Sequence, residues 1–212
     1  MTLITAIATP YFISFVGDGR GVTGDNDEVV EEKLDKICRI NDKIVIATAG
    51  NRTFNTKYIP EILANVDNKY NLSNVESFVE SLFEVVGYNK TGFDYRLIIG
   101  GLNKDGDICF THIDSTSSIK PQVVVLNEFS QRGTAANNSK HTYHFLVQPN
   151  DLLSARLNEA LTTYEEYVNF NPEKAFAIQK QFNYDISQSD RTVNNFLTRD
   201  VVLREKPLLI NA

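Results

Sequence analysis

The stretch that decides the fold spans residues 3–21 and reads LITAIATPYFISFVGDGRG. Its residues are mostly small, β-branched or aromatic, and apolar side chains fall on both alternating faces, with Leu3 and Ile7 on one face and Ile4 and Ala6 on the other. A Thr-Pro dipeptide divides the stretch and a glycine-rich run ends it, which predicts two strands joined by a tight turn. A strand that is apolar on both faces is buried on both faces, so this hairpin requires a further layer on each side.

Strands and pairs of helices alternate along the rest of the chain. Turn-forming dipeptides predict two further hairpins, over residues 36–49 and 97–111. Apolar periodicity predicts four helices, over residues 58–66, 73–86, 153–168 and 171–182. Short strands are expected over residues 123–126, 143–147 and 193–203. Two of the helices carry start signals: a capping box of Ser73 and Glu76, and the cap Asn171-Pro172.

This order of elements predicts the fold class. Strand blocks without strict β-α alternation argue against a doubly wound parallel sheet. We expect an α+β fold, a four-layer αββα sandwich of two antiparallel sheets covered on the outside by helices. Neither a linker, nor a low-complexity segment, nor a repeat of solenoid period interrupts the sequence, so residues 1–212 are expected to form a single domain.

Composition argues against some classes of binding partner and indicates a cellular compartment. The 212 residues carry 21 Lys and Arg against 27 Asp and Glu, a net charge of −6, which argues against nucleic acid and membrane surfaces as partners. The first sixteen residues lack a basic segment and contain Pro10, so we interpret them as structure and not as a secretory signal. The two cysteines, Cys38 and Cys109, are too few for a disulfide scaffold, and the cytoplasm is the expected compartment.

Four pieces of sequence, in order, carry a family resemblance: Thr2 at the start of the first hairpin, VGDGR at 16–20, KICRI at 36–40 and ATAG at 47–50. Together they resemble the proteasome-type β subunits of the N-terminal-nucleophile hydrolases, especially the bacterial proteasome-like peptidase that works with an unfoldase ATPase. The resemblance covers about the first quarter of the chain. It implies a peptide or protein substrate, a homo-oligomeric ring, a possible ATPase partner and no cofactor.

The resemblance also implies catalytic roles. Thr2 would be the nucleophile once Met1 is removed, and its own α-amine, with an ordinary pKa of about 7.7–8.0, suits a general base at neutral pH. Lys36 would lie beside this nucleophile, and Asp18 would keep the lysine charged and oriented, because a buried ammonium needs a partner. Gly50 would offer its N–H to the oxyanion, since a residue without Cβ lets substrate approach the backbone.

Further positions follow from the same resemblance. Thr48, Arg52 and Thr23 are expected to line the pocket for the substrate side chain, which suggests a polar or acidic preference. Asp185, Ser189 and Ser130 are expected to hold the nucleophile's amine. Here the sequence departs from the family pattern: the glycine after the first serine is missing, and so is a Gly-Ser-Gly turn around the second.

Several alternatives remain open. Lys33 competes with Lys36 for the catalytic position. The glycine-rich run at 17–21 lacks the Lys-Ser/Thr of a phosphate loop, and neither residues 25–27 nor the pair His141 and His144 has the pattern of a metal site, so no metal is expected. Cys38 lacks an adjacent base for a nucleophilic role. A catalytically silent proteasome-like scaffold and an unrelated α+β binding domain are the two alternative functions.

Overall fold

The structure is a computed structural model that describes residues 3–23, 28–51, 54–64, 70–86, 92, 94–117, 119–126, 143–146 and 171–205. The strands are β1 (Ile4–Ala8), β2 (Phe12–Asp18), β3 (Gly21–Thr23), β4 (Glu28–Glu31), β5 (Ile37–Asn41), β6 (Ile44–Gly50), β7 (Tyr95–Leu102), β8 (Ile108–Asp114), β9 (Val124–Leu126), β10 (Tyr143–Leu146) and β11 (Leu197–Leu203). The helices are α1 (Ile59–Ala64), which follows the π-helical turn η1 (Phe54–Tyr58), α2 (Val75–Val86) and α4 (Pro172–Ser187).

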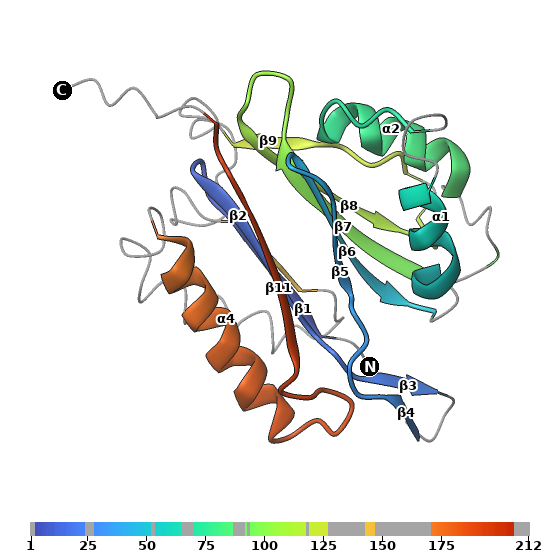
Figure 1. Ribbon diagram of the computed structural model, residues 1–212, viewed down its shortest axis with the longest axis vertical. Coiled ribbons are helices and arrows are strands. Elements are labelled where there is room, and N and C mark those ends of the chain that lie inside the picture. Colours follow the sequence, from blue (N-terminus) through green and yellow to red (C-terminus); the bar gives the residue numbers. More distant parts are fainter. Residues whose placement is uncertain are drawn as a thin grey trace.

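Two antiparallel sheets form the centre of the molecule. Within the described residues, one has the order β10-β1-β2-β11 and the other the order β5-β6-β7-β8-β9, while β3 and β4 form a separate two-stranded ribbon. Figure 1 shows α4 on the outer side of the first sheet, and α1 and α2 on the outer side of the second. The predicted α+β class and its four layers are confirmed.

The first hairpin is buried on both faces, as its composition predicts. Leu3 and Ile7 pack in the apolar cluster beneath α4, together with Phe182 of that helix. Ile4 and Ala6 belong to the cluster between the two sheets. Every residue of β1 and β2 is buried. The hairpin is therefore the central element against which both the helix and the second sheet are packed.

Most of the predicted elements are present. The hairpins at 36–49 and 97–111 form as β5–β6 and β7–β8. Asn171 caps α4, accepting hydrogen bonds from the N–H groups of Glu173 and Lys174. The short strands at 123–126 and 143–147 appear as β9 and β10.

Other element boundaries need correction. Asn74, and not Ser73, caps α2, because its side chain accepts the N–H of Ser77 at 2.9 Å. Helix α4 continues five residues beyond the expected end, to Ser187. The last strand begins at Leu197 and not at residue 193. The ribbon β3–β4 was not predicted, and the expected helix over residues 153–168 lies outside the described residues.

No helix in the described part of the chain is long and apolar enough to cross a membrane.

Candidate functional site

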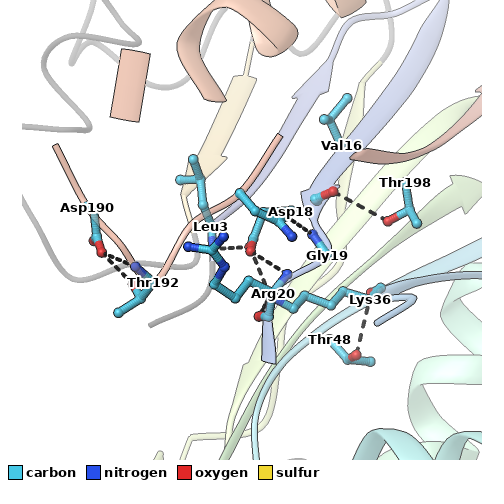
Figure 2. A network of polar contacts seen from close by, with 12 residues as sticks. Leu3, Val16, Asp18, Gly19, Arg20, Lys36, Thr48, Asp190, Thr192 and Thr198 are labelled. Carbon is cyan, nitrogen blue, oxygen red and sulfur yellow. Dashed lines mark hydrogen bonds and ion pairs between the residues drawn. The ribbon is translucent and has the colours of Figure 1, made fainter. Parts of the chain in front are cut away.

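The centre of the candidate site is a buried ion pair between Asp18 and Lys36. Asp18 is the last residue of β2 in the first sheet, and Lys36 directly precedes β5 in the second. The Lys36 ammonium lies 2.9 Å from Asp18 Oδ1 and donates a second hydrogen bond, of 2.7 Å, to the carbonyl oxygen of Arg20. Relative exposure is 0% for Asp18 and 2% for Lys36. The contact expected between these two residues is therefore formed (Figure 2).

The Asp18 carboxylate also hydrogen-bonds to the backbone of Leu3, the first residue that the structure describes. Its Oδ1 accepts the N–H of Leu3 at 2.8 Å, and its Oδ2 accepts the N–H of Arg20 at 2.9 Å. The backbone N–H of Asp18 donates in turn to the Leu3 carbonyl. Both carboxylate oxygens are thus satisfied, as a buried charge requires. Leu3 follows Thr2 in the chain, so the nitrogen of the peptide bond between them is hydrogen-bonded to the ion pair.

Burial sets the electrostatics of Lys36. Removal from water lowers the pKa of its ammonium below the ordinary value, and the charge and hydrogen bond of Asp18 offset this effect only in part. Two of the three ammonium protons are used by Asp18 and Arg20. Within the part of the chain that the structure describes, no further hydrogen bond uses the third proton.

The competing lysine lies elsewhere. Lys33 is exposed, and its ammonium lies 5.8 Å from the centre of the Phe196 ring, a cation–π contact. The structure thus brings Lys36, and not Lys33, to Asp18.

Strand β6 carries Thr48 and Gly50, of which Thr48 is bonded to Lys36. The N–H of Thr48 donates to the Lys36 carbonyl at 2.8 Å, and the Thr48 side chain is 2% exposed. Gly50 ends β6 as its exposed residue and has a φ of +106°. A Cβ there would lie 2.5 Å from the carbonyl oxygen of Asp94, so both the backbone angle and the space require glycine. The roles assigned to Thr48 and Gly50 stay predictions.

Two of the residues expected to hold the amine lie on or after α4. Asp185 is exposed on the helix, where its carboxylate accepts a hydrogen bond from Gln181 at 2.8 Å. Ser189 is exposed beyond the helix, and its hydroxyl donates to the Ile186 carbonyl. Within the described residues, no hydrogen bond joins either of them to Asp18 or Lys36.

Thr2, Arg52 and Ser130 lie outside the described residues, as does His141. Thr23 is the last residue of β3.

Two residues that were not among the predicted site residues, Arg20 and Asn194, complete the surroundings of the pair. Arg20 contributes its carbonyl to Lys36, and its side chain donates to the Glu32 carboxylate at 3.1 Å and to the carbonyl of Arg191. Asn194 accepts the N–H of Gly19 at 3.0 Å. Arg20 stood within the motif at 16–20, but its contribution is a backbone carbonyl, which a residue type does not reveal. Asn194 has no local sequence signal.

The structure gives no support to a cysteine nucleophile. Cys38 is a half-buried free thiol, and burial raises its pKa, with the charges of Asp200 and Asp35 adding to the effect. A raised pKa disfavours the thiolate that would be the reactive form.

Comparison with known proteins concerns the fold. No family model matches the sequence, and no curated protein matches it. Among solved structures, Anbu (ancestral beta-subunit) from Yersinia bercovieri is similar over 95% of this chain and 82% of its own, with a TM-score of 0.65 and 17% sequence identity. Eukaryotic HslV from Trypanosoma brucei is similar over 95% of this chain and 99% of its own, with a TM-score of 0.59 and 15% identity.

Both of these proteins are proteasome-type N-terminal-nucleophile hydrolases. Their similarity covers nearly the whole chain, whereas the motifs that suggested the resemblance lie in its first quarter. The chain therefore has the proteasome-type sandwich fold, and the resemblance is confirmed at the level of the fold.

Proposed function

We propose that this chain is a threonine-type amidohydrolase or peptidase that uses Thr2, made N-terminal by removal of Met1, as its nucleophile. One observation carries the proposal: the buried Asp18–Lys36 pair is hydrogen-bonded to the N–H of Leu3, the residue next to Thr2. A buried lysine whose ammonium uses two of its protons among the described residues, and whose carboxylate partner binds the residue after Thr2, suits the activation of the Thr2 hydroxyl.

The proposed reaction proceeds in two steps. The Thr2 hydroxyl oxygen attacks the carbonyl carbon of an amide, and the α-amine takes the hydroxyl proton. The Gly50 N–H stabilises the resulting oxyanion, and the positive charge of Lys36 stabilises negative charge on the Thr2 oxygen. The carbon–nitrogen bond then breaks, and the leaving amine receives the proton. Water, deprotonated by the same α-amine, hydrolyses the ester and restores Thr2.

Peptides or proteins are the substrates, Thr48, Arg52 and Thr23 line the pocket for a substrate side chain, and Asp185, Ser189 and Ser130 hold the amine. The chain assembles into a homo-oligomeric ring, with an ATPase as a possible partner. It works in the cytoplasm as one domain over residues 1–212. The two free thiols, Cys38 and Cys109, support a reducing compartment.

Covalent labelling tests the nucleophile. Protein that has lost Met1, as checked by intact mass, should react with a β-lactone or an epoxyketone, the latter using both the hydroxyl and the amine of Thr2. Thr2→Ala should abolish labelling at a cost in stability of about 1 kcal/mol or less, because it removes only one hydroxyl and one methyl group. Thr116→Ala, at an exposed threonine, serves as the matched control and should label as wild type. Label that persists in Thr2→Ala would show that Thr2 is not the nucleophile.

A catalytically silent scaffold is the alternative function. The placement of Asp185 on the exposed side of α4, bonded to Gln181, favours it, because that carboxylate has its own local partner. Processed wild-type protein that takes up neither probe would make the scaffold the better interpretation.

A further inference from the structure

The loop between α4 and β11, residues 188–196, is attached to the turn that carries Asp18. Gly19, the next residue, donates its N–H to Oδ1 of Asn194 at 3.0 Å. Nδ2 of Asn194 donates to the Glu32 carbonyl and to the Glu32 carboxylate, both at 2.8 Å. Asn194 is 8% exposed, and its amide is used as acceptor and as donor. One buried side chain therefore joins three segments that are distant in the sequence.

Two of these segments carry the two members of the ion pair. Gly19 directly follows Asp18, and Glu32 lies four residues before Lys36. A backbone hydrogen bond of 2.7 Å from Leu34 to Gly19 runs between the same two segments. Asn194 hydrogen-bonds to both of them, in addition to this direct backbone bond.

An aromatic contact reinforces this attachment. A Cβ on Gly19 would lie 2.3 Å from Cδ1 of Phe196, so the ring packs directly against the glycine backbone. Lys33, from the segment before Lys36, places its ammonium over the same ring at 5.8 Å. The loop thus contacts the turn at 18–20 and the segment at 32–36 through both a polar and an aromatic side chain. Figure 2 shows the turn, with Asp18, Gly19 and Arg20, beside Lys36.

We propose that Asn194 is a positioning residue, which holds Asp18 and Lys36 at the separation that the reaction of Thr2 requires. The effect on catalysis rests on the proposed function. The effect on the geometry of the Asp18–Lys36 pair does not depend on it. Without the amide, the Gly19 N–H and the Glu32 carbonyl lose their partner, and the remaining contacts between the two segments, such as the Leu34–Gly19 hydrogen bond, hold them less precisely. A small displacement of a catalytic group is enough to slow a reaction by about 100-fold.

The Lys36 ammonium provides a readout that does not depend on activity. Its protons are shielded and hydrogen-bonded to two acceptors, so their exchange with water is slow and they should give a resolved nitrogen–proton NMR signal, assigned by its loss in Lys36→Arg. In Asn194→Ala this signal should disappear. Asn195→Ala is the matched control, because Asn195 is exposed and bonded to Ser187 of α4, and it should keep the signal. A role in stability alone would lower the melting temperature and leave the signal of the folded protein in place.

Labelling of Thr2 connects the inference to catalysis. The rate of reaction with the epoxyketone should fall by about 100-fold in Asn194→Ala and stay at the wild-type value in Asn195→Ala. If wild-type protein does not label at all, the proposed function fails, and the NMR signal still decides whether Asn194 positions the pair. A Lys36 signal that is absent in wild type, or present unchanged in Asn194→Ala, overturns the inference.

A second variant keeps the test valid if Asn194→Ala does not fold. Asn194→Asp has the same shape and still accepts the Gly19 N–H, but it turns the donor group into a carboxylate oxygen that faces Glu32. It should lose the Lys36 signal as well. Adding Glu32→Gln supplies a donor amide opposite the new carboxylate and should restore the signal at least in part. A signal that persists in Asn194→Asp, or that is lost and does not return in the double variant, contradicts the proposed role.

Discussion

At the scale of the residue, Lys33 and Lys36 show how the environment separates two similar side chains. They are three positions apart, yet Lys33 is exposed and Lys36 is buried against Asp18. Lys36→Ala should therefore abolish labelling of Thr2, whereas Lys104→Ala, the control at an exposed lysine in the turn between β7 and β8, should label at the wild-type rate. Loss of one partner leaves the Asp18 carboxylate buried and unpaired, at a cost of about 3–5 kcal/mol in the free energy of unfolding.

A double variant separates catalysis from stability in this experiment. Removing Asp18 together with Lys36 takes away the unpaired carboxylate, so the free energy of unfolding, measured with urea, should recover much of this loss, while labelling stays absent. A double variant that labels at the wild-type rate would contradict a catalytic role for the lysine.

The same pair predicts a pH profile for labelling. The rate should rise as the α-amine of Thr2 loses its proton, around its ordinary pKa of about 7.7–8.0. It should fall again as Lys36 loses its charge, and because burial lowers that pKa, this fall should begin below the ordinary lysine value of 10.5. In Lys104→Ala both limbs should be unchanged.

At the scale of the element, Gln179 determines how α4 lies on the first hairpin. Its Nε2 lies 3.1 Å from both oxygens of Thr5 and 3.2 Å from the Ser14 carbonyl, and its Oε1 accepts the Ser14 hydroxyl at 2.8 Å. The side chain is fully buried. Gln179→Leu leaves these groups without their partner, so the free energy of unfolding in urea should fall by about 1–3 kcal/mol.

Gln181→Leu is the matched control on the same helix. Gln181 is exposed and bonded to Asp185, so its replacement should change the free energy of unfolding by less than about 0.5 kcal/mol. Equal losses in the two variants would mean that the buried contacts of Gln179 contribute nothing beyond an ordinary helix position.

Elements governed by local rules could be predicted from the sequence, and those decided by distant contacts could not. The first hairpin was predictable because both faces of β1 are apolar, and Asn171 because caps are local. Ser73 and Asn74, both of residue types that favour helix caps, are adjacent before α2. Only the hydrogen bond from the N–H of Ser77 identifies Asn74 as the cap. Helix α4 continues to Ser187, so Asp185 lies within the helix and not in the loop after it.

The candidate site divides in the same way. The Asp18–Lys36 pair was predictable from physical chemistry and from the motif, because a lysine beside an apolar strand needs a counter-charge. Asn194 was not, since its partners Gly19 and Glu32 lie 175 and 162 residues away in the chain and two of its three contacts are to backbone atoms. Only the closed sandwich brings these three segments together.

At the scale of the whole molecule, the ion pair joins the two sheets. Asp18 ends β2 of the first sheet, and Lys36 precedes β5 of the second. The pair can therefore form only when the two sheets are stacked, which makes the site a property of the complete sandwich. The burial of both Asp18 and Lys36 follows from the same stacking.

The last prediction concerns assembly. Apolar side chains remain exposed on the described surface, with Val29 at 46% and Val30 at 43% on the β3–β4 ribbon, and Phe196 at 38% in the loop between α4 and β11. A two-stranded ribbon alone is only marginally stable in water, so a contact with a second copy would stabilise it. In a ring, each subunit uses two different surfaces, and the rotation between neighbours closes. Sedimentation velocity over a concentration series around the micromolar range should therefore show one discrete species larger than a dimer. A monomer at every concentration would contradict the ring, and so would a species that grows without limit, because contacts that fail to close give open filaments.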